Sequence, residues 1–303
     1  MIYKNTEKKG ITMSMIEEKQ RKGTIKMPNF YQNLKKMTLL SAIFSGVFMA
    51  NAGDEPTAWP WSKYGIEQTD NPCAIPTPYT DKGKLAQYAQ LKKIDFSGWG
   101  RNVIFLGDSI MNGWRPAGNG VKVLKEYSEK YPMVQPLNLF AMSGDEPQNT
   151  LWLITEGDIL QSLQSPKVIV LMIGVNSLNL KKTPEQVAGG IKAIITYLRA
   201  NRPDTKILLF GILPCWGGKA PVLEEIKKTN QIICKYADNK DVFFLDFGDK
   251  LLTADGNINP ELSYDAIHLT EKGHELWAKI MFPYLDDLVK TGGNGEIWKT
   301  SAK

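Results

Sequence analysis

Histidine and cysteine are both scarce in this sequence, with two and three residues in a chain of 303. Neither type forms a cluster that binds metals, because the cysteines are far apart and His268 and His274 lack an H-E-x-x-H arrangement. Metal-dependent chemistry is therefore poorly supported, and no cofactor is expected. The odd number of cysteines allows at most one internal disulfide.

A long apolar run is also missing. The best candidate, Met37–Met49, is shorter than the roughly 20 residues that cross a bilayer. It follows two lysines and precedes Ala-Asn-Ala, which is the layout of a secretory signal peptide. We therefore expect a leader over residues 1–52, cleavage after Ala52, and a secreted or periplasmic protein with no stable membrane span. An uncleaved membrane anchor is the weaker alternative.

The predicted mature chain lacks an excess of either charge. Residues 1–52 hold nine of the 37 basic residues and three of the 32 acidic residues, so the whole-chain net charge of +5 arises in the leader. The rest of the chain carries 28 basic and 29 acidic residues, a net charge of −1. This balance argues against nucleic-acid binding, which usually requires a basic surface.

Hydrophobic periodicity divides the remaining chain into three parts. It is weak over residues 53–100, where Pro, Trp and polar residues are frequent, and we expect an extended arm there that packs on the main domain. Over residues 101–290, short apolar runs alternate with longer amphipathic segments, which is typical of βαβ units and a parallel sheet. Residues 291–303 are expected to form a C-terminal tail.

The regular part predicts five strands, each apolar almost throughout and therefore buried on both faces. These strands are Asn102–Leu106, Gln135–Phe140, Lys167–Ile173, Lys206–Phe210 and Val242–Asp246. The predicted helices are Lys122–Tyr131, Gln148–Leu163, Pro184–Ala200, Pro221–Ala237 and Thr270–Leu288. Together they predict an α/β fold: a single-domain, three-layer α/β/α arrangement around a five-stranded parallel sheet. Ligands of such folds bind beyond the carboxyl ends of the strands, so the residues there are functional candidates.

A serine lies directly after the first predicted strand, in Gly107-Asp108-Ser109. The glycine permits a tight turn, and the helix start that follows can present backbone N–H groups to an oxyanion. By itself this tripeptide fits an Asp or Ser helix cap better than a nucleophile. No G-x-S-x-G segment surrounds Ser109, so the nucleophile elbow of α/β-hydrolases is not supported.

A serine nucleophile needs a base, and His268 is the better candidate of the two histidines. Asp265 stands three residues before it, in a loop that leads into the last helix. This spacing can bring both side chains to one pocket, where the carboxylate would orient the imidazole. His274 lies inside the predicted helix, where we expect a surface or packing role.

Two further glycine turns follow predicted strands. Gly144 comes after the second strand, and its N–H is a candidate donor to an oxyanion. Asn176 follows Gly174 after the third strand, and its side-chain amide is another candidate. Each also fits an ordinary turn, but all the candidates fall at one edge of one sheet.

These blocks, in order, match those of the SGNH (GDSL) hydrolases, which the chain resembles from about residue 102 to residue 288. Gly107–Trp114 and Val187–Ile194 are similar to the branch that contains the catalytic subunits of platelet-activating-factor acetylhydrolase and bacterial acetylesterases. The resemblance implies a flavodoxin-like fold and a catalytic triad of Ser109, His268 and Asp265. It also implies an oxyanion hole made by the N–H groups of Ser109 and Gly144 and the amide of Asn176.

The resemblance implies a serine esterase that hydrolyses short acyl esters, acetyl esters above all. Export favours O-acetyl groups on a polysaccharide over a cytosolic lipid as the substrate. A lysophospholipase or thioesterase on the same machinery stays open as an alternative, as does a catalytically idle sugar-binding module. Because the branch includes dimers, a homodimer is also left open. The candidate residues of the substrate pocket are Asp108, Trp114, Trp152 and Ser177.

Overall fold

A computed structural model describes residues 59–93, 102–132, 137–157, 159, 166–215 and 222–300. These residues belong to one compact unit of the chain. The predicted leader and its cleavage site lie outside the described residues, and so do parts of three predicted elements, at residues 135–136, 158, 160–163 and 221.

The centre of the fold is a sheet of five parallel strands in the order β2-β1-β3-β4-β5. The strands are β1 (Val103–Gly107), β2 (Leu137–Ala141), β3 (Val168–Met172), β4 (Lys206–Phe210) and β5 (Val242–Leu245). The last residue of β1, Gly107, pairs with the last residues of both neighbours, Ala141 and Met172. Three strands therefore end in line, and the segments that follow them start from one edge of the sheet.

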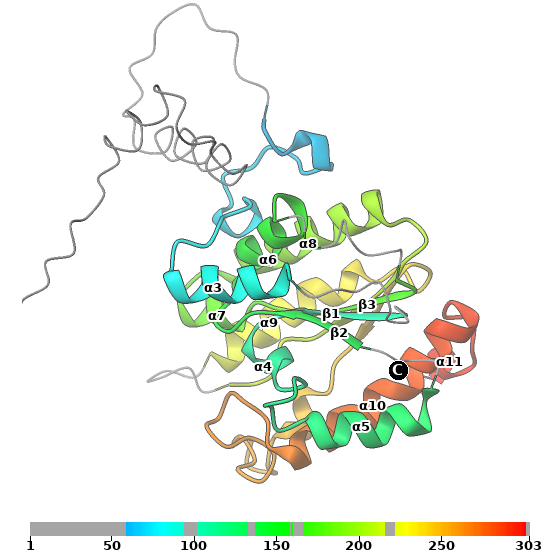
Figure 1. Ribbon diagram of the computed structural model, residues 1–303. Helices are drawn as coiled ribbons and strands as arrows, with labels where there is room; N and C mark the ends of the chain where they lie inside the picture. Colours follow the sequence, from blue (N-terminus) through cyan, green and yellow to red (C-terminus); the bar gives the residue numbers. More distant parts are fainter. Residues whose placement is uncertain are drawn as a thin grey trace, which may run out of the picture. The chain divides into compact units, whose positions relative to one another are not determined.

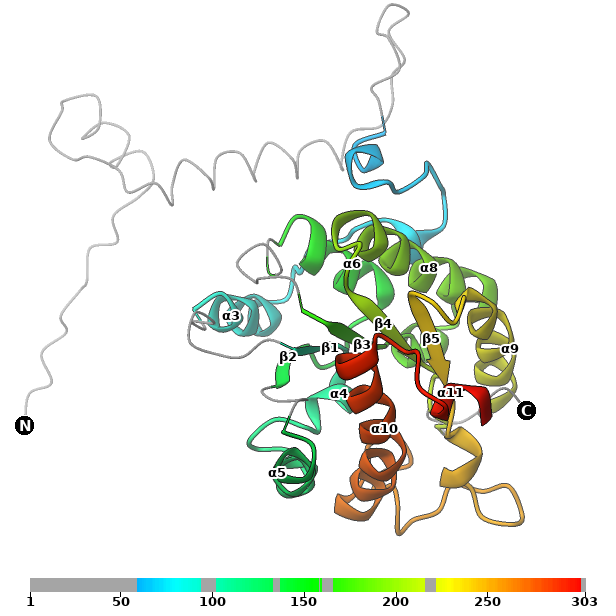
Figure 2. The ribbon, with the colours of Figure 1, turned by 90° about the vertical axis from the view of Figure 1, so that its right-hand side faces the viewer.

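Helices cover both faces of the sheet, as Figures 1 and 2 show. One face carries α5 (Val121–Lys130) and α10 (Glu271–Thr291). The other face carries α6 (Pro147–Thr155), α8 (Pro184–Asn201) and α9 (Leu223–Ile233), the last continued by η4 (Cys234–Tyr236). Short helices α4 (Ser109–Asn112), α7 (Val175–Asn179) and η5 (Gly248–Leu251) follow β1, β3 and β5. The predicted three-layer α/β fold is confirmed.

The core explains why the strands are almost wholly apolar. Every residue of β1 and β3 is buried, because helices pack against both faces of these central strands. On the α10 side, the Trp277 ring packs against Trp114 and Phe210, with ring centroids 5.2 and 5.6 Å away. All three rings of this cluster are fully buried between α10 and the sheet.

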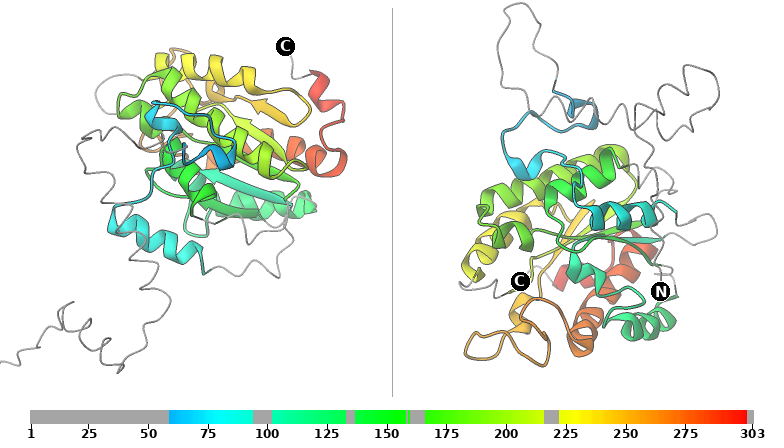
Figure 3. Two further views of the ribbon diagram at one scale, coloured as in Figure 1. Left: turned by 90° about the horizontal axis from the view of Figure 1, so that it is seen from above. Right: turned by 60° about the vertical axis from the view of Figure 1, so that its left-hand side comes forward.

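The predicted extended arm contains helical structure, so that expectation was incomplete. Its described part holds η1 (Ser62–Tyr64), η2 (Pro72–Ala74) and α3 (Lys82–Leu91). Figure 3 shows the segment with η1 and η2 lying over α8. In α3 only Leu91 is buried, so the helix has no apolar stripe to reveal it in the sequence. Asp81 caps its start by accepting a hydrogen bond from the Lys84 N–H, 2.9 Å away.

Several predicted boundaries differ from the structure. Helix α6 ends at Thr155, eight residues before the predicted end at Leu163. At the C-terminus, α10 continues to Thr291, and the predicted tail holds a further short helix, α11 (Ile297–Thr300). Among the described residues, no helix combines the length and the apolar character that crossing a membrane requires.

Candidate active site

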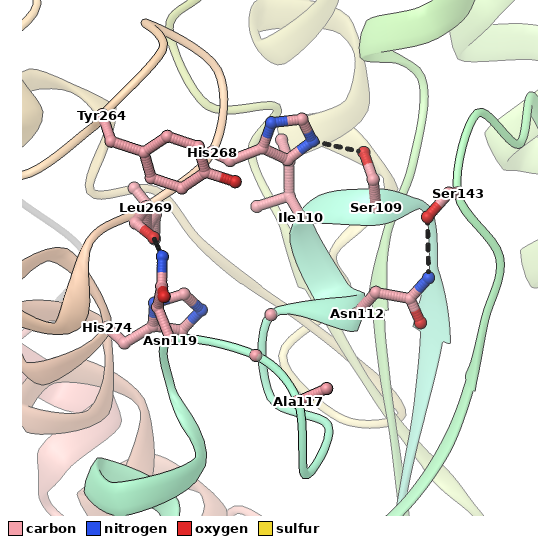
Figure 4. Close-up of a pocket in the computed structure, with 12 residues that line it drawn as sticks. Ser109, Ile110, Asn112, Ala117, Asn119, Ser143, Tyr264, His268, Leu269 and His274 are labelled. Carbon is pink, nitrogen blue, oxygen red and sulfur yellow. Dashed lines mark hydrogen bonds between the residues drawn. The ribbon is translucent and has the colours of Figure 1, made fainter.

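Ser109 stands at the start of α4, immediately beyond the end of β1 (Figure 4). Asp108 forms the N-cap of this helix, and its Oδ1 accepts a hydrogen bond from the Ile110 N–H at 3.0 Å. As the first helical residue, Ser109 has a backbone N–H that no carbonyl within the helix can accept. The turn therefore offers a hydroxyl and a backbone donor side by side.

His268 connects Ser109 to Asp265. The Ser109 Oγ lies 2.8 Å from the His268 Nε2, and the His268 Nδ1 lies 2.6 Å from the Asp265 Oδ2. If Nδ1 carries the proton and donates it to the carboxylate, Nε2 is the acceptor for the serine hydroxyl. The structure thus brings together the three side chains that the sequence singled out, in the order that a serine nucleophile, base and orienting acid require.

The Asp265 carboxylate is fixed by its own loop. Its Oδ1 accepts hydrogen bonds from the backbone N–H groups of Ile267, at 3.0 Å, and His268, at 2.7 Å. Partial burial alone would raise the pKa of Asp265, but the hydrogen bonds from the His268 side chain and the two N–H groups outweigh it and hold the pKa below its ordinary value. Asp265 is therefore ionised at neutral pH and holds the imidazole in one orientation.

The turn after β2 holds Gly144 with a positive φ of 73°, a backbone conformation that a side chain would strain. The Gly144 N–H donates to no other backbone group in the described part of the chain. Asn176 follows β3 as the second residue of α7, and its Nδ2 donates to the Asp145 carbonyl oxygen at 2.8 Å. One N–H of that amide is thereby occupied, and the second is left for another acceptor.

Gly174 lets α7 begin so close to the end of β3. Its φ is 128°, and a Cβ at this position would lie 2.7 Å from the Val187 Cγ1 and 2.8 Å from the Ile212 Cδ1. Any other residue would therefore strain the backbone at the start of α7 and crowd these two side chains. Gly174, which the sequence predicts in a turn, is therefore also required by the close packing around it.

A cavity of about 240 Å³ opens beside Ser109 and His268. Most of its lining is polar, and the Asn112 Nδ2 donates to the Ser143 Oγ at 3.2 Å on one side (Figure 4). Tyr264 stands on another side, 61 % exposed, with its ring nearly parallel to the His268 ring and the centroids 5.9 Å apart. The reacting hydroxyl therefore faces a small polar hollow with an exposed aromatic ring at its edge.

His274 lines the same cavity but makes no contact with Ser109. It is buried, its Nδ1 lies 2.9 Å from the Thr270 carbonyl oxygen, and its ring packs edge-on against Trp114. Burial lowers the pKa of His274, outweighing the opposite effect of the hydrogen bond to Thr270, so the ring is neutral at pH 7. This arrangement agrees with the packing role expected from its place in a helix.

The four candidate pocket residues do not line this cavity. Trp114 is fully buried in the core, and Asp108 is buried beneath Ser109, where burial raises its pKa to about 7. Ser177 is buried and donates to the Glu146 Oε2 at 2.7 Å, while Trp152 packs edge-on against Tyr79 and Tyr88. Nearness to a motif in the sequence therefore did not place these four side chains in the cavity.

Sequence reasoning also missed lining residues. Tyr264 and Asn119 both face the cavity, and neither belongs to a motif that identified it. Tyr264 precedes Asp265 directly, so an aromatic residue beside a candidate acid is the signal that could have revealed it. No group of three or more His, Cys, Asp or Glu side chains within the described ranges is arranged to hold a metal ion.

Comparison with known proteins identifies the family. The model of the GDSL-like lipase/acylhydrolase family matches residues 105–276. Subunit alpha2 of platelet-activating factor acetylhydrolase IB from Homo sapiens is 31 % identical over 219 residues, which cover 70 % of this chain and 88 % of that protein. Subunit alpha1 from Bos taurus is 28 % identical over 209 residues, covering 68 % of this chain and 85 % of that protein.

A solved structure shows the same fold. The crystal structure of a GDSL-like lipase from Bacteroides thetaiotaomicron superposes with a TM-score of 0.52 at 19 % identity, covering 68 % of this chain and 97 % of the other. The matched segment of the family model contains Ser109, Gly144, Asn176, Asp265 and His268. The chain therefore belongs to the GDSL-like lipase/acylhydrolase family and is a carboxylic ester hydrolase.

Proposed function

We propose that this protein is a serine esterase that removes acetyl groups from O-acetylated carbohydrate through an acyl-enzyme on Ser109. The observation that carries the proposal is the hydrogen-bonded series Ser109–His268–Asp265 at the wall of a polar cavity. Secretion or export to the periplasm, predicted from the leader, would bring such an enzyme to extracellular polysaccharides.

In the acylation half of the reaction, the Ser109 Oγ attacks the ester carbonyl carbon while its proton moves to the His268 Nε2. The oxyanion that forms accepts hydrogen bonds from the N–H groups of Ser109 and Gly144 and from the Asn176 amide. The carbon–oxygen bond to the alcohol then breaks, and His268 gives its proton to the leaving oxygen. Asp265 stabilises the imidazolium between these two transfers.

Deacylation repeats these steps with water as the nucleophile. His268 takes a proton from the water, whose oxygen attacks the acyl carbon, and the tetrahedral intermediate collapses as Ser109 regains its proton. The products are acetate and the free enzyme. His268 and the three oxyanion donors act in both acylation and deacylation, so one base and one set of donors are enough for the whole reaction.

Two features favour a short acyl group on a sugar. The curated relatives are named acetylhydrolases, which supports acetyl as the group removed. The small cavity and its polar lining suit a hydroxylated alcohol, and the exposed Tyr264 ring offers a flat apolar surface of the kind that packs on sugar rings. A lysophospholipid or an acyl thioester would place a long apolar chain against these polar groups.

The test is a substrate screen with a matched variant. Purified protein is offered acetylated xylan or pectin oligomers, p-nitrophenyl acetate, lysophospholipids and acyl thioesters, with released acid measured directly. We expect acetate from the oligomers and from p-nitrophenyl acetate, and a loss of at least 10³-fold in Ser109→Ala. Equal rates for both proteins would overturn the esterase mechanism. Faster turnover of lysophospholipids or thioesters would overturn the substrate assignment.

A further inference from the structure

The predicted arm reaches the loop that holds Gly144. From α3, the Lys84 Nζ donates to the Gly144 carbonyl oxygen at 2.9 Å and to the Asp145 Oδ1 at 3.1 Å. The Lys84 side chain is 24 % exposed, while the carboxylate of Asp145 is almost fully buried, at 1 %. An ion pair this sheltered from water is screened less than a surface pair.

Tyr79 supplies the second partner of the same carboxylate. Its hydroxyl donates to the Asp145 Oδ2 at 2.7 Å, and its side chain is buried. Burial raises the pKa of Asp145 to about 6, although Tyr79 and Lys84 both act in the opposite direction. Two donors from the arm therefore bind the two oxygens of one buried acid, which would otherwise be a costly group to bury.

Asp145 in turn connects this contact to the reaction site. Its backbone carbonyl oxygen accepts the hydrogen bond from the Asn176 Nδ2 at 2.8 Å, and Gly144 precedes it in the chain. Two of the three donors assigned to the oxyanion hole thus belong to this short loop or are oriented by it. A shift of the loop would move both donors together.

The arm is itself anchored at both ends of α6. The Thr77 N–H donates to the Gln148 carbonyl oxygen at 3.0 Å near the start of that helix. Beyond its end, the Tyr88 hydroxyl donates to the Gly157 carbonyl oxygen at 2.6 Å. Between these points, the rings of Tyr79, Tyr88 and Trp152 pack together, with centroids 5.2 to 6.3 Å apart. Lys84 and Tyr79 therefore reach the loop from a fixed support.

These contacts come from outside the segment that the family model matches, which starts at residue 105. We propose that the arm segment, residues 77–88, holds the oxyanion hole in its working geometry, with Lys84 and Tyr79 as positioning residues for Gly144 and Asn176. The proposal rests on the esterase mechanism given above. Donors to an oxyanion stabilise the transition state only if they are held in place before charge develops. Movement of this loop should therefore lower kcat and leave substrate affinity unchanged.

The test compares Lys84→Met with Lys82→Met, a control on the same helix whose side chain is exposed. With p-nitrophenyl acetate, we expect Lys84→Met to lower kcat at least 10-fold with KM within about 2-fold, and Lys82→Met to match the wild type. Lys84→Arg can still donate to the Gly144 carbonyl oxygen and the Asp145 Oδ1, so this variant should recover part of the loss in kcat. Tyr79→Phe, which removes one hydroxyl from a buried site, should lower kcat in the same way.

A transition-state analogue separates positioning from folding. A small alkylboronic acid forms a tetrahedral adduct on the serine, so its inhibition constant should rise in Lys84→Met in proportion to the fall in kcat/KM. Thermal unfolding shows that each variant is folded. A folded Lys84→Met and a folded Tyr79→Phe with wild-type kcat would overturn the proposal. Ser109→Ala is run in parallel: if it stays active, the esterase mechanism itself fails, whatever Lys84 does.

Discussion

Among the residues of the cavity, Tyr264 combines exposure with contact to the imidazole. Its ring is 61 % exposed, lines the cavity, and lies at 20° to the plane of the His268 ring with the centroids 5.9 Å apart. A substrate sugar that packs there would bring its ester toward Ser109. The ring is thus placed to affect binding of the alcohol part more than the chemistry at the acyl carbon.

Tyr264→Ala should raise KM for acetylated xylan or pectin oligomers about 5-fold, since ring packing contributes on the order of 1 kcal/mol. For p-nitrophenyl acetate, which has no sugar, the change in KM should stay within about 2-fold. Steady-state kinetics on both substrates measure the contrast. Tyr264→Phe keeps the ring and serves as the control, with KM close to wild type. Equal changes on both substrates would contradict a sugar contact.

Residues at the ends of strands and the Asp265–His268 pair were predictable from the sequence, whereas Lys84 was not. Ser109, Gly144 and Asn176 follow three strands that end in line, so a rule about sheet edges was enough to group them. Lys84 meets its partner Gly144 across 60 residues of sequence. A polar contact of that kind leaves no periodicity or motif in the chain.

At the scale of elements, α8 shows how the sequence specifies where a helix starts. Thr183 and Gln186 form a capping box: the Thr183 Oγ1 accepts from the Gln186 N–H at 3.2 Å, and the Gln186 Oε1 accepts from the Thr183 N–H at 3.0 Å. Pro184 occupies the first turn, where its missing N–H costs nothing. This helix also supports η2 of the arm and packs against α6 and α9.

Thr183→Ala should lower the free energy of unfolding by about 1 kcal/mol, because the Gln186 N–H in the first turn of α8 loses the hydroxyl that accepts its hydrogen bond. Thr183 does not line the cavity, so kcat per folded molecule should stay at the wild-type value. Urea unfolding gives the first quantity and steady-state kinetics the second. Thr183→Ser keeps the hydroxyl and should unfold near the wild-type midpoint. Wild-type stability in Thr183→Ala would show that the box contributes nothing.

The elements differed in how well the sequence predicted them. Buried strands and amphipathic helices are recognised by the spacing of their apolar residues. The predicted bounds of β4 agree with the structure at both ends. Helix α3 has a single buried residue, so no period marks it, and its side chains Lys84 and Tyr88 hold it against the domain by polar contacts. The tail contains α11 because the Trp298 ring packs on Phe243, a long-range contact that composition does not reveal.

At the scale of the whole molecule, buried carboxyl groups couple stability to pH. Burial raises the pKa of Asp108 from 3.8 to about 7, and that of Asp145 shifts in the same direction. Between these limits the folded protein binds more protons than the unfolded chain, so the free energy of unfolding falls as pH rises. The contribution is fully present below pH 3.8 and is lost by the time the pH passes the folded pKa of about 7.

Asp108→Asn should make the protein less sensitive to pH between 5 and 8, because an amide keeps a capping oxygen and never ionises. The wild type should lose up to roughly 3 kcal/mol more than the variant across this range, and Asp145 should leave a residual slope in both. Urea unfolding at pH 5 and pH 8 measures the difference. Asp255→Asn is the control, since Asp255 is exposed and hydrogen bonds from Thr253 and Asn257 hold its pKa below the ordinary value. Parallel profiles for wild type and Asp108→Asn would contradict the prediction.

The Ser109–His268 hydrogen bond joins residues 159 positions apart in the chain. Ser109 follows β1, the first strand in the chain, and His268 lies between β5 and α10, so the polypeptide between the two residues contains the other four strands of the sheet. Contacts of such long range form late, after the loop between them has closed. Hydrolytic activity should therefore be the last property to return during refolding, after helix content and burial of the tryptophans. The time at which activity returns then reports when the fold is complete.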